Sequence, residues 1–127
     1  MTGILVDSDI LIEVFRGRNR ILLQAWHDLS QREDLIATSA INVAELWRGV
    51  LAPEREALRQ LLAELTCLPL DREEGELAGE LMRRYAPSHG LELPDALIAS
   101  VAVTQRLNFW TRNRRHFPMP ELRFYDV

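Results

Sequence analysis

Several acidic side chains follow the predicted strands of this chain at positions where they could bind a metal ion. Asp7 and Asp9 come directly after the first apolar run, and Glu45 lies about one helical turn into the element after the second run. Asp95 stands at the start of a later helix, and Asn113 follows the next strand. Because ligands bind beyond the carboxyl ends of the strands in an open parallel sheet, we expect these oxygens to meet there. Clustered carboxylates repel one another unless a hard cation lies among them, so the sequence favours Mg²⁺ or Mn²⁺ at this edge.

Each of these residues also has a purely structural interpretation. Asp7 could begin an Asx turn, and a carboxylate at Asp9 or Asp95 is favoured near a helix N-terminus by the helix dipole. Asn113 could cap a helix. The periodicity argues against a role for Glu45, because the apolar residues at positions 43, 46, 47 and 50 form a stripe that points away from it and places it on the surface. The residue types and spacings alone leave both interpretations open.

Short apolar runs alternate with longer helical patterns along the chain, which is typical of βαβ units and a mostly parallel sheet covered on both faces. Strands are expected at residues 3–6, 35–37, 67–70 and 108–111, with a last one around 123–125. Helices are expected at residues 10–15 and 20–32. Thr38 or Ser39 would cap a third, and Pro53 would open a fourth. A fifth would run through Leu77 and Tyr85 until residues 87–90 interrupt it, and a last one would begin at Pro94. We expect Ser8 or Asp9 to cap the first helix, with Gly17 as its stop signal.

The length and composition fit one ordinary globular domain spanning residues 1–127, with the α/β class of a three-layer α/β/α sandwich. Apolar residues make up 47% of the 127 and charged residues 27%. No apolar stretch approaches the roughly 20 residues that cross a bilayer, and the start of the chain lacks a signal-type pattern, so a cytoplasmic protein without a membrane partner is expected. The apolar neighbours of Cys67 predict a buried thiol.

The formal net charge is −4, with 15 basic residues against 19 acidic ones, so any contact with nucleic acid must be local. All the basic residues are arginines, which excludes reactions that need a lysine amine. Guanidinium groups grip phosphates and stack on unpaired bases. Two groups of arginines are expected on the side of the carboxylates and are candidates for binding RNA: Arg16, Arg18 and Arg20, and Arg112, Arg114 and Arg115. A solvated charged rim is the alternative interpretation.

Four segments taken together resemble the PIN domain, and more narrowly the VapC toxins of bacterial type II toxin–antitoxin pairs. They read LVDSDILI from Leu5, INVAELWRG from Ile41, LPDALIA from Leu93 and TRNRRHF from Thr111. They occur in the order and at the spacing of the compact form of this domain, and the resemblance covers essentially the whole chain.

The resemblance implies a set of site residues. Asp7, Glu45 and Asp95 match the three acidic positions that hold the metal, so Glu45 gains a role that its periodicity does not show. Asn113 matches the fourth position, where the family often has Asp, and it brings no charge. Asp9 is an extra carboxylate, ranked as an outer or water-mediated ligand. Two residues match small hydroxyl positions next to the ligands: Ser8 and Thr111.

The family also implies a function. The resemblance implies that this chain is a Mg²⁺-dependent endoribonuclease whose expected substrate is tRNA or rRNA. Water would attack the RNA and leave a 5′-phosphate and a 3′-hydroxyl. VapC-like toxins act as homodimers and are silenced by a cognate antitoxin protein. Candidate interface residues are Trp26, Trp47 and Leu51, although such side chains also fill cores.

Two other functions compete with this expectation. A PIN-like module without catalytic activity could bind RNA or protein, although the intact carboxylates argue against it. A small phosphatase of the haloacid dehalogenase type is suggested by the pair Asp7 and Asp9 after the first strand. That chemistry, like that of a phosphoacceptor receiver domain, also uses a later Lys, which this chain lacks.

Overall fold

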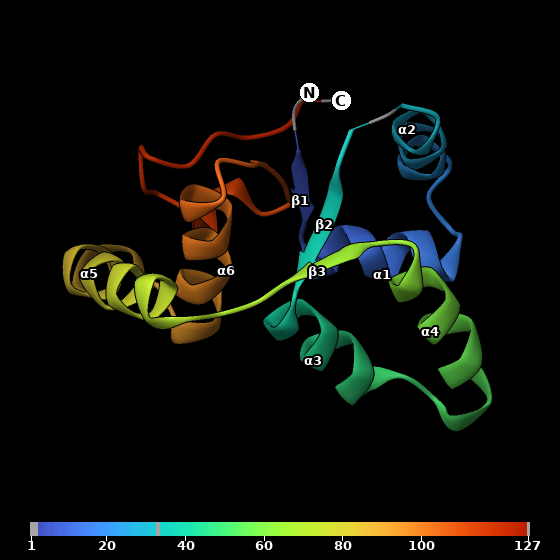
Figure 1. The fold of residues 1–127 in the computed structure, drawn as a ribbon, viewed down its shortest axis with the longest axis horizontal. Helices are drawn as coiled ribbons and strands as arrows, with labels where there is room; N and C mark the ends of the chain where they lie inside the picture. The colour runs from blue at the N-terminus through green and yellow to red at the C-terminus, as the bar shows by residue number, and fades with distance from the viewer. Residues whose placement is uncertain (1–2, 33, 127) are drawn as a thin grey trace.

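The sheet is built from four short parallel strands in a computed structural model that describes residues 3–32 and 34–126 (Figure 1). The strands are β1 (Ile4–Val6), β2 (Ile36–Ser39), β3 (Thr66–Leu68) and β4 (Asn108–Trp110). Their spatial order is β3-β2-β1-β4, so the first strand of the chain lies inside the sheet beside the last. Leu5 pairs with Ala37 on one side and with Phe109 on the other. The first strand of the chain therefore pairs with the last, which forms one edge of the sheet.

In the described part of the chain, the two faces of this sheet are covered by six α-helices: α1 (Ser8–Arg16), α2 (Arg20–Ser30), α3 (Ala40–Gly49), α4 (Arg55–Ala63), α5 (Arg72–His89) and α6 (Leu93–Thr104). Short 3-10 turns occupy Ala52–Glu54 and Arg114–His116. Helices α5 and α6 lie on one side of the sheet, and α1 to α4 lie on the other (Figure 1). This arrangement confirms the predicted three-layer α/β/α fold with a parallel sheet.

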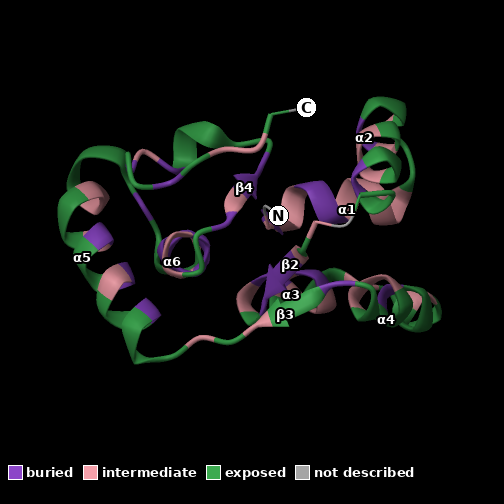
Figure 2. Cartoon of the chain, turned by 45° about the horizontal axis from the view of Figure 1, so that its top comes forward, coloured by how far each residue is buried: buried purple, intermediate pink, exposed green. Residues whose placement is uncertain are grey.

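The two cores follow from the alternation of side chains along the strands. Leu5 and Phe109 face α5 and α6, whereas Ile4, Val6 and Trp110 face the other four helices. Figure 2 shows the buried parts of the helices turned toward the sheet. Among the described residues, no helix combines the length and apolar character needed to span a bilayer.

Local signals set the ends of the first helix and correct one expectation. Asp7, rather than Ser8 or Asp9, is the N-cap of α1: its backbone is extended, and its side chain accepts from the Ser8 main-chain nitrogen at 2.8 Å. Gly17 ends the helix as expected, with a left-handed φ of 67° that a residue without a Cβ adopts readily. The site carboxylate Asp7 is thus fixed by the start of α1.

Three other expectations were wrong. Residues 123–125 form only an isolated bridge, because Phe109 alone exchanges main-chain bonds with this segment. Helix α5 continues past Pro87 and ends at Gly90, because a proline in the last turn removes only one helical hydrogen bond. Cys67 is exposed, because its strand β3 lies at the edge of the sheet.

Candidate active site

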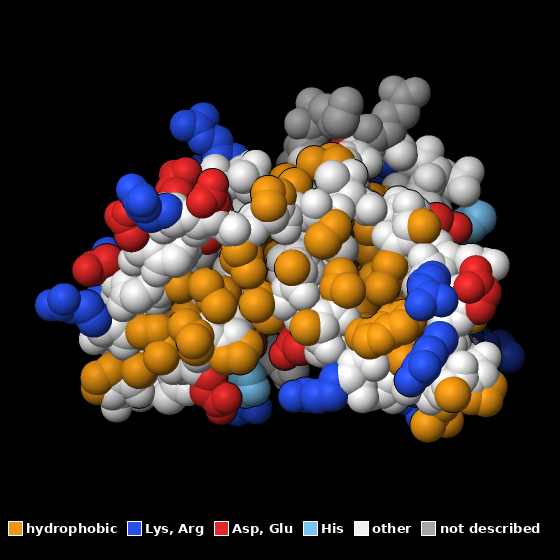
Figure 3. All heavy atoms as spheres, turned by 60° about the horizontal axis from the view of Figure 1, so that its bottom comes forward, with side chains coloured by type: hydrophobic (Ala, Val, Ile, Leu, Met, Phe, Trp, Pro, Cys, Tyr) orange, Lys and Arg blue, Asp and Glu red, His pale blue; other side chains and the backbone are white. Residues whose placement is uncertain are grey.

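The predicted carboxylates lie at the carboxyl end of the parallel sheet. Asp7 and Asp9 begin α1 directly after β1, and Glu45 lies on α3, which follows β2. Asp95 is in the first turn of α6, and Asn113 follows β4. Figure 3 views this end of the molecule, where acidic and basic side chains lie close together between two areas of apolar side chains. The topology therefore gathers side chains that are far apart in the sequence.

Asp7 is a buried carboxylate held by three donors. Its Oδ1 accepts from the Ser8 main-chain nitrogen at 2.8 Å and from Asn42 Nδ2 at 3.3 Å. Its Oδ2 accepts from Thr111 Oγ1 at 2.8 Å. The side chain is 8% exposed. Because two carboxylate oxygens offer about four acceptor positions, Asp7 is fixed in place and still has capacity for one further ligand.

Asp9 presents one fully used oxygen and one that is free of donors. Oδ2 accepts from the Arg112 main-chain nitrogen at 2.9 Å, Asn113 Nδ2 at 3.1 Å and Thr111 Oγ1 at 3.3 Å. Oδ1 is buried and has no hydrogen-bond partner among the described residues. A buried carboxylate oxygen without a donor is unfavourable unless a cation or water satisfies it.

Glu45 points toward the site, so the surface position predicted from its periodicity was wrong. Ser8 Oγ donates to Glu45 Oε1 at 2.7 Å and accepts from Asn42 Nδ2 at 2.8 Å. Asn42 precedes Glu45 by three positions, which places both on one face of α3. That face is polar because it borders the site, and a count of apolar residues alone does not detect it.

Asn42 is a site residue that the sequence analysis missed. Its side chain is fully buried and contacts both Asp7 and Ser8. Asn42 Oδ1 accepts from Ser39 Oγ at 2.6 Å, which leaves the amide hydrogens directed at the site. The spacing of Asn42 from Glu45, together with the Ser39 cap, was the available signal.

Asp95 is half-buried on the same side of α6 as the buried residues Ile98 and Ala99, as its spacing predicted. Burial raises its pKa, and the nearby charge of Glu45 raises it further, while the charge of His116 acts in the opposite direction. These electrostatic effects link Asp95 to the other carboxylates.

Burial also disfavours the charged forms of the two aspartates after β1. It is the main cause that raises the pKa of Asp7 to about 7, and the charge of Asp9 adds to it. Burial likewise raises the pKa of Asp9, against the hydrogen bonds from Arg112 and Thr111. The site thus concentrates negative charge that a cation would stabilise.

The donor set fits a hard divalent cation. It consists of carboxylate oxygens, the ligands that Mg²⁺ and Mn²⁺ prefer, and Asp9 Oδ1 lacks any other partner among the described residues. Within residues 3–32 and 34–126, no three acidic, histidine or cysteine side chains are already grouped closely enough to hold an ion. The carboxylates would therefore have to close around the ion as it binds.

Asn113 does not present an oxygen to the cluster. Its Nδ2 donates to Asp9 Oδ2 at 3.1 Å, and its main-chain nitrogen donates to Thr111 Oγ1 at 3.1 Å. Asn113 therefore orients Asp9 and Thr111 in this structure.

Within each of the two predicted arginine groups, some members form ion pairs among the described residues and others do not. Arg16 forms an ion pair with Glu54, and Arg114 pairs with Asp126 while its guanidinium lies 4.9 Å from the centre of the Phe124 ring. Arg114 is exposed, as are the four remaining members of the two groups: Arg18, Arg20, Arg112 and Arg115. Of the second group, Arg115 has no ion pair within the described part of the chain.

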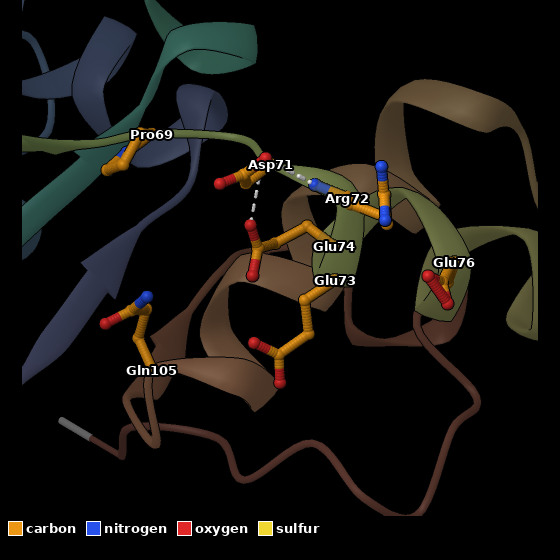
Figure 4. A pocket seen from close by; sticks show the side chains of 7 residues that line it. All are labelled: Pro69, Asp71, Arg72, Glu73, Glu74, Glu76 and Gln105. Atoms are coloured by element: carbon orange, nitrogen blue, oxygen red, sulfur yellow. Dashed lines mark hydrogen bonds between the residues drawn. The ribbon is translucent and has the colours of Figure 1, made fainter.

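A surface pocket of about 300 Å³ lies beside the carboxylates, lined by Thr111 and the following loop through His116. A larger pocket of about 740 Å³ lies at the start of α5, away from the site, and Figure 4 shows its acidic lining. Glu74 there accepts from the Asp71 main-chain nitrogen at 2.8 Å and from Thr104 Oγ1 at 2.9 Å. The buried carboxylate of the larger pocket is therefore satisfied by the fold itself.

Comparison with known proteins identifies the family of the chain. The PIN domain profile matches residues 4–121. The chain belongs to the PIN-domain family. Ribonuclease VapC10 of Mycobacterium tuberculosis is 39% identical over 119 residues, covering 93% of this chain and 88% of the relative. Ribonuclease VapC19 of the same organism is 30% identical over 120 residues, covering 93% and 95%.

Solved structures show the same PIN architecture. FitAcB from Neisseria gonorrhoeae matches with a TM-score of 0.78 and 29% identity, covering 97% of this chain and 96% of the other. A toxin–antitoxin complex from Klebsiella pneumoniae matches with a TM-score of 0.76 and 28% identity, covering 98% and 100%. VapBC2 from Rickettsia felis, bound to a promoter DNA fragment, shares the fold with a TM-score of 0.82 at 22% identity and covers 99% of both chains. Membership of this family sets aside the phosphatase and receiver-domain interpretations.

Proposed function

We propose that this PIN-domain protein is a divalent-metal-dependent endoribonuclease that acts as the toxin of a toxin–antitoxin pair. One observation carries the metal dependence: Asp9 Oδ1 is buried without a donor among the described residues, beside the buried carboxylate of Asp7. The VapC relatives named ribonucleases support RNA as the substrate. We expect the protein to act in the cytoplasm, on tRNA or rRNA.

The side chains of the site have separate roles in this proposal. Asp7, Glu45 and Asp95 would hold Mg²⁺ or Mn²⁺, with Asp9 Oδ1 as a further ligand. The ion would activate the attacking water and offset charge on the phosphoryl oxygens, so that the products carry a 5′-phosphate and a 3′-hydroxyl. Asn42 and Thr111 fix the Asp7 carboxylate through hydrogen bonds at 3.3 and 2.8 Å. One of the aspartates would accept the proton that the attacking water loses.

The second arginine group would hold the RNA backbone. Arg112 and Asn113 are attached to Asp9 by hydrogen bonds, so the loop after β4 lies directly beside the carboxylates. The exposed guanidinium of Arg115 can contact a phosphate without breaking an ion pair within the described residues. Local positive charge thus offsets the negative charge of the whole chain.

We also propose an antitoxin partner, which the toxin–antitoxin complex from Klebsiella pneumoniae supports, and a homodimer, which the resemblance to VapC toxins implies. Of the predicted interface residues, Leu51 is 62% exposed, whereas Trp26 and Trp47 are half-buried. The guanidinium of Arg59 lies 5.0 Å from the centre of the Trp47 ring. Leu51 is therefore the most accessible of the three for a partner.

Cleavage of total tRNA and rRNA by the purified protein tests this function. Cleavage should require Mg²⁺ or Mn²⁺, stop in excess EDTA and yield ends that a 5′-phosphate-dependent ligase accepts. Asp7→Asn and Asp95→Asn should each abolish cleavage, because each removes a charged ligand. Glu121→Gln is a matched control, since Glu121 pairs with Arg84 and lies outside the site. Undiminished cleavage in EDTA would refute the proposed mechanism, and RNA binding without any cleavage would favour the catalytically silent module.

A further inference from the structure

We propose that Glu13 is a positioning residue that holds Arg18 and Arg112 together as one phosphate-binding pair beside the carboxylates. This inference rests on the proposed function, because it concerns how the same site holds RNA. Glu13 would thus favour RNA binding, although its own negative charge repels the phosphates of RNA.

Glu13 connects the two arginine groups that the sequence places far apart. Its Oε1 lies 3.4 Å from Arg18 Nη2 and 3.6 Å from Arg112 Nη1. The Glu13 side chain is 18% exposed, whereas those of Arg18 and Arg112 are 70% and 47% exposed. The carboxylate is thus largely covered, and the two guanidinium groups remain open to a ligand.

Helix α1 holds Arg112 by both its main chain and its side chain. Asp9 Oδ2 accepts from the Arg112 main-chain nitrogen at 2.9 Å, and Glu13 pairs with its guanidinium. Asp9 and Glu13 are four positions apart on α1 and therefore lie on the same face of that helix. The arginine pair is consequently fixed one helical turn from the carboxylate cluster.

Arg18 reaches Glu13 because the chain turns back at the end of α1. Gly17 adopts the left-handed conformation there, and its main-chain nitrogen donates to Glu13 O at 2.9 Å. Arg16 pairs instead with Glu54, so it is not part of this arrangement. Arg18 is the member of its group that the fold directs toward Arg112.

Glu13 would favour RNA binding by ordering the side chains of Arg18 and Arg112 before the RNA arrives. A free arginine loses side-chain entropy when it binds a phosphate, and a partly ordered one loses less. The ion pairs to Glu13 are long and their guanidinium groups are exposed, so they are weak, and a phosphate can replace them with charge-assisted hydrogen bonds. Glu13 would thus arrange the arginines without competing strongly for them.

The direction in which Glu13→Gln changes the Kd for RNA distinguishes a positioning role from simple repulsion between Glu13 and the phosphates. The probe is a fluorescein-labelled 20-nucleotide single-stranded RNA, and its fluorescence anisotropy is followed at low salt in EDTA, where metal-dependent cleavage is excluded. Glu13→Gln should raise the Kd about threefold, although it makes the protein less acidic. If Glu13 only repels RNA, the same variant will bind more tightly. Equal or tighter binding would overturn the inference.

Four further measurements separate positioning from general effects of charge and folding. Glu121→Gln removes the same charge from another arginine pair, at 3.0 Å, and should bind RNA no more weakly than the parent. In an Arg18→Ala, Arg112→Ala background, Glu13→Gln should cause no further loss, since there is nothing left to position. A further threefold loss in that background would contradict the positioning role. Circular dichroism melts establish that each variant is folded, and Glu13→Asp, which keeps the charge on a shorter side chain, should also weaken binding.

The parent protein separates this inference from the function on which it depends. If the parent neither binds the labelled RNA nor cleaves tRNA or rRNA with metal, the proposed function fails and the inference fails with it. If the parent binds and cleaves, and Glu13→Gln does not weaken binding, only the positioning role fails.

Discussion

The side-chain amide of Asn42 donates to the carboxylate of Asp7 at 3.3 Å, and both side chains are buried. The same amide nitrogen donates to Ser8 Oγ at 2.8 Å, and Ser8 donates in turn to Glu45. Asn42 therefore links the carboxylate that follows β1 to the carboxylate on α3. Two neutral side chains, those of Asn42 and Ser8, thus connect two acidic ones.

Asn42→Ala should reduce both stability and cleavage. The substitution removes the buried acceptor of the Ser39 hydroxyl and one of the three donors to the Asp7 carboxylate, which typically costs about 1–3 kcal/mol in the free energy of unfolding. Cleavage should fall mainly through kcat, because Asp7 and Glu45 lose their common support. Urea unfolding and steady-state kinetics measure the two effects.

Asn19→Ala is the matched control for this variant. Asn19 caps α2 by accepting from the Leu22 main-chain nitrogen at 3.1 Å, so its loss should cost about 1 kcal/mol away from the site. We expect its kcat to be unchanged. An Asn42→Ala protein with normal kcat would show that the amide serves the fold alone.

The stability of the metal-free protein should fall as the pH rises. Burial raises the pKa of Asp7 from 3.8 in the unfolded chain to about 7, so between these values the folded protein keeps a proton that the unfolded chain has lost. The stabilisation is complete below about pH 4 and is lost by about pH 7. The shift corresponds to about 4 kcal/mol, and the raised pKa values of Asp9 and Asp95 act in the same direction.

Thermal melts in EDTA between pH 5 and pH 8 measure this dependence. Asp7→Asn should flatten it, because the substituted side chain does not titrate. Saturating Mg²⁺ should also flatten it by stabilising the charged carboxylates. A melting temperature that rises with pH in EDTA would contradict the prediction.

Asn113→Asp should tighten metal binding. The new carboxylate would replace a donor that lies 3.1 Å from Asp9 Oδ2, adding attraction for a cation and repulsion in its absence. The Mg²⁺ concentration for half-maximal cleavage should fall severalfold, while the melting temperature in EDTA at pH 8 should decrease.

The same substitution at Asn108 provides the control, because that residue begins β4 at the opposite end of the strand. Asn108→Asp should leave the Mg²⁺ titration unchanged. An Asn113→Asp protein with an unchanged or higher half-saturation point would exclude Asn113 as the position that limits metal occupancy.

Arg115→Ala should weaken RNA binding and reduce its dependence on salt. A phosphate contact releases bound counterions, so losing one contact should lower the slope of log K against log salt by about 1. Arg114→Ala should have a smaller effect, because Arg114 is already occupied by Asp126 and by the Tyr125 carbonyl at 3.3 Å. An unchanged slope in Arg115→Ala would mean that the Arg16 to Arg20 group, or a second subunit, holds the RNA.

The layered fold was predictable because its signals are local and repeated. Apolar residues recur at the helical period along α6, and Ile98, Val101 and Ala102 are fully buried there. The rule that ligands gather at the carboxyl ends of parallel strands was enough to assign Asp7 and Asp95 to one edge of the sheet.

Other features depend on contacts that a local pattern does not contain. Cys67 has the neighbours of a core residue, but its exposure follows from the edge position of β3, which depends on the order of all four strands. Asn42 and Glu45 face the site on the polar side of a short helix, and a search for apolar stripes ignores that side. Whether Asn113 offers an oxygen or a nitrogen depends on Asp9, which is 104 residues away in sequence.

The hydrogen bonds between α1 and the loop after β4 also determine when, during synthesis of the chain, the site can form. Thr111 and Asn113 are translated 104 residues after Asp7 and Asp9, respectively, the carboxylates to which they donate. A growing polypeptide therefore carries the carboxylates of Asp7 and Asp9 while 104 further residues are added, without the hydroxyl and amide that orient them. The proposed active site can therefore form only after the loop that follows β4 has been synthesised and has folded against α1.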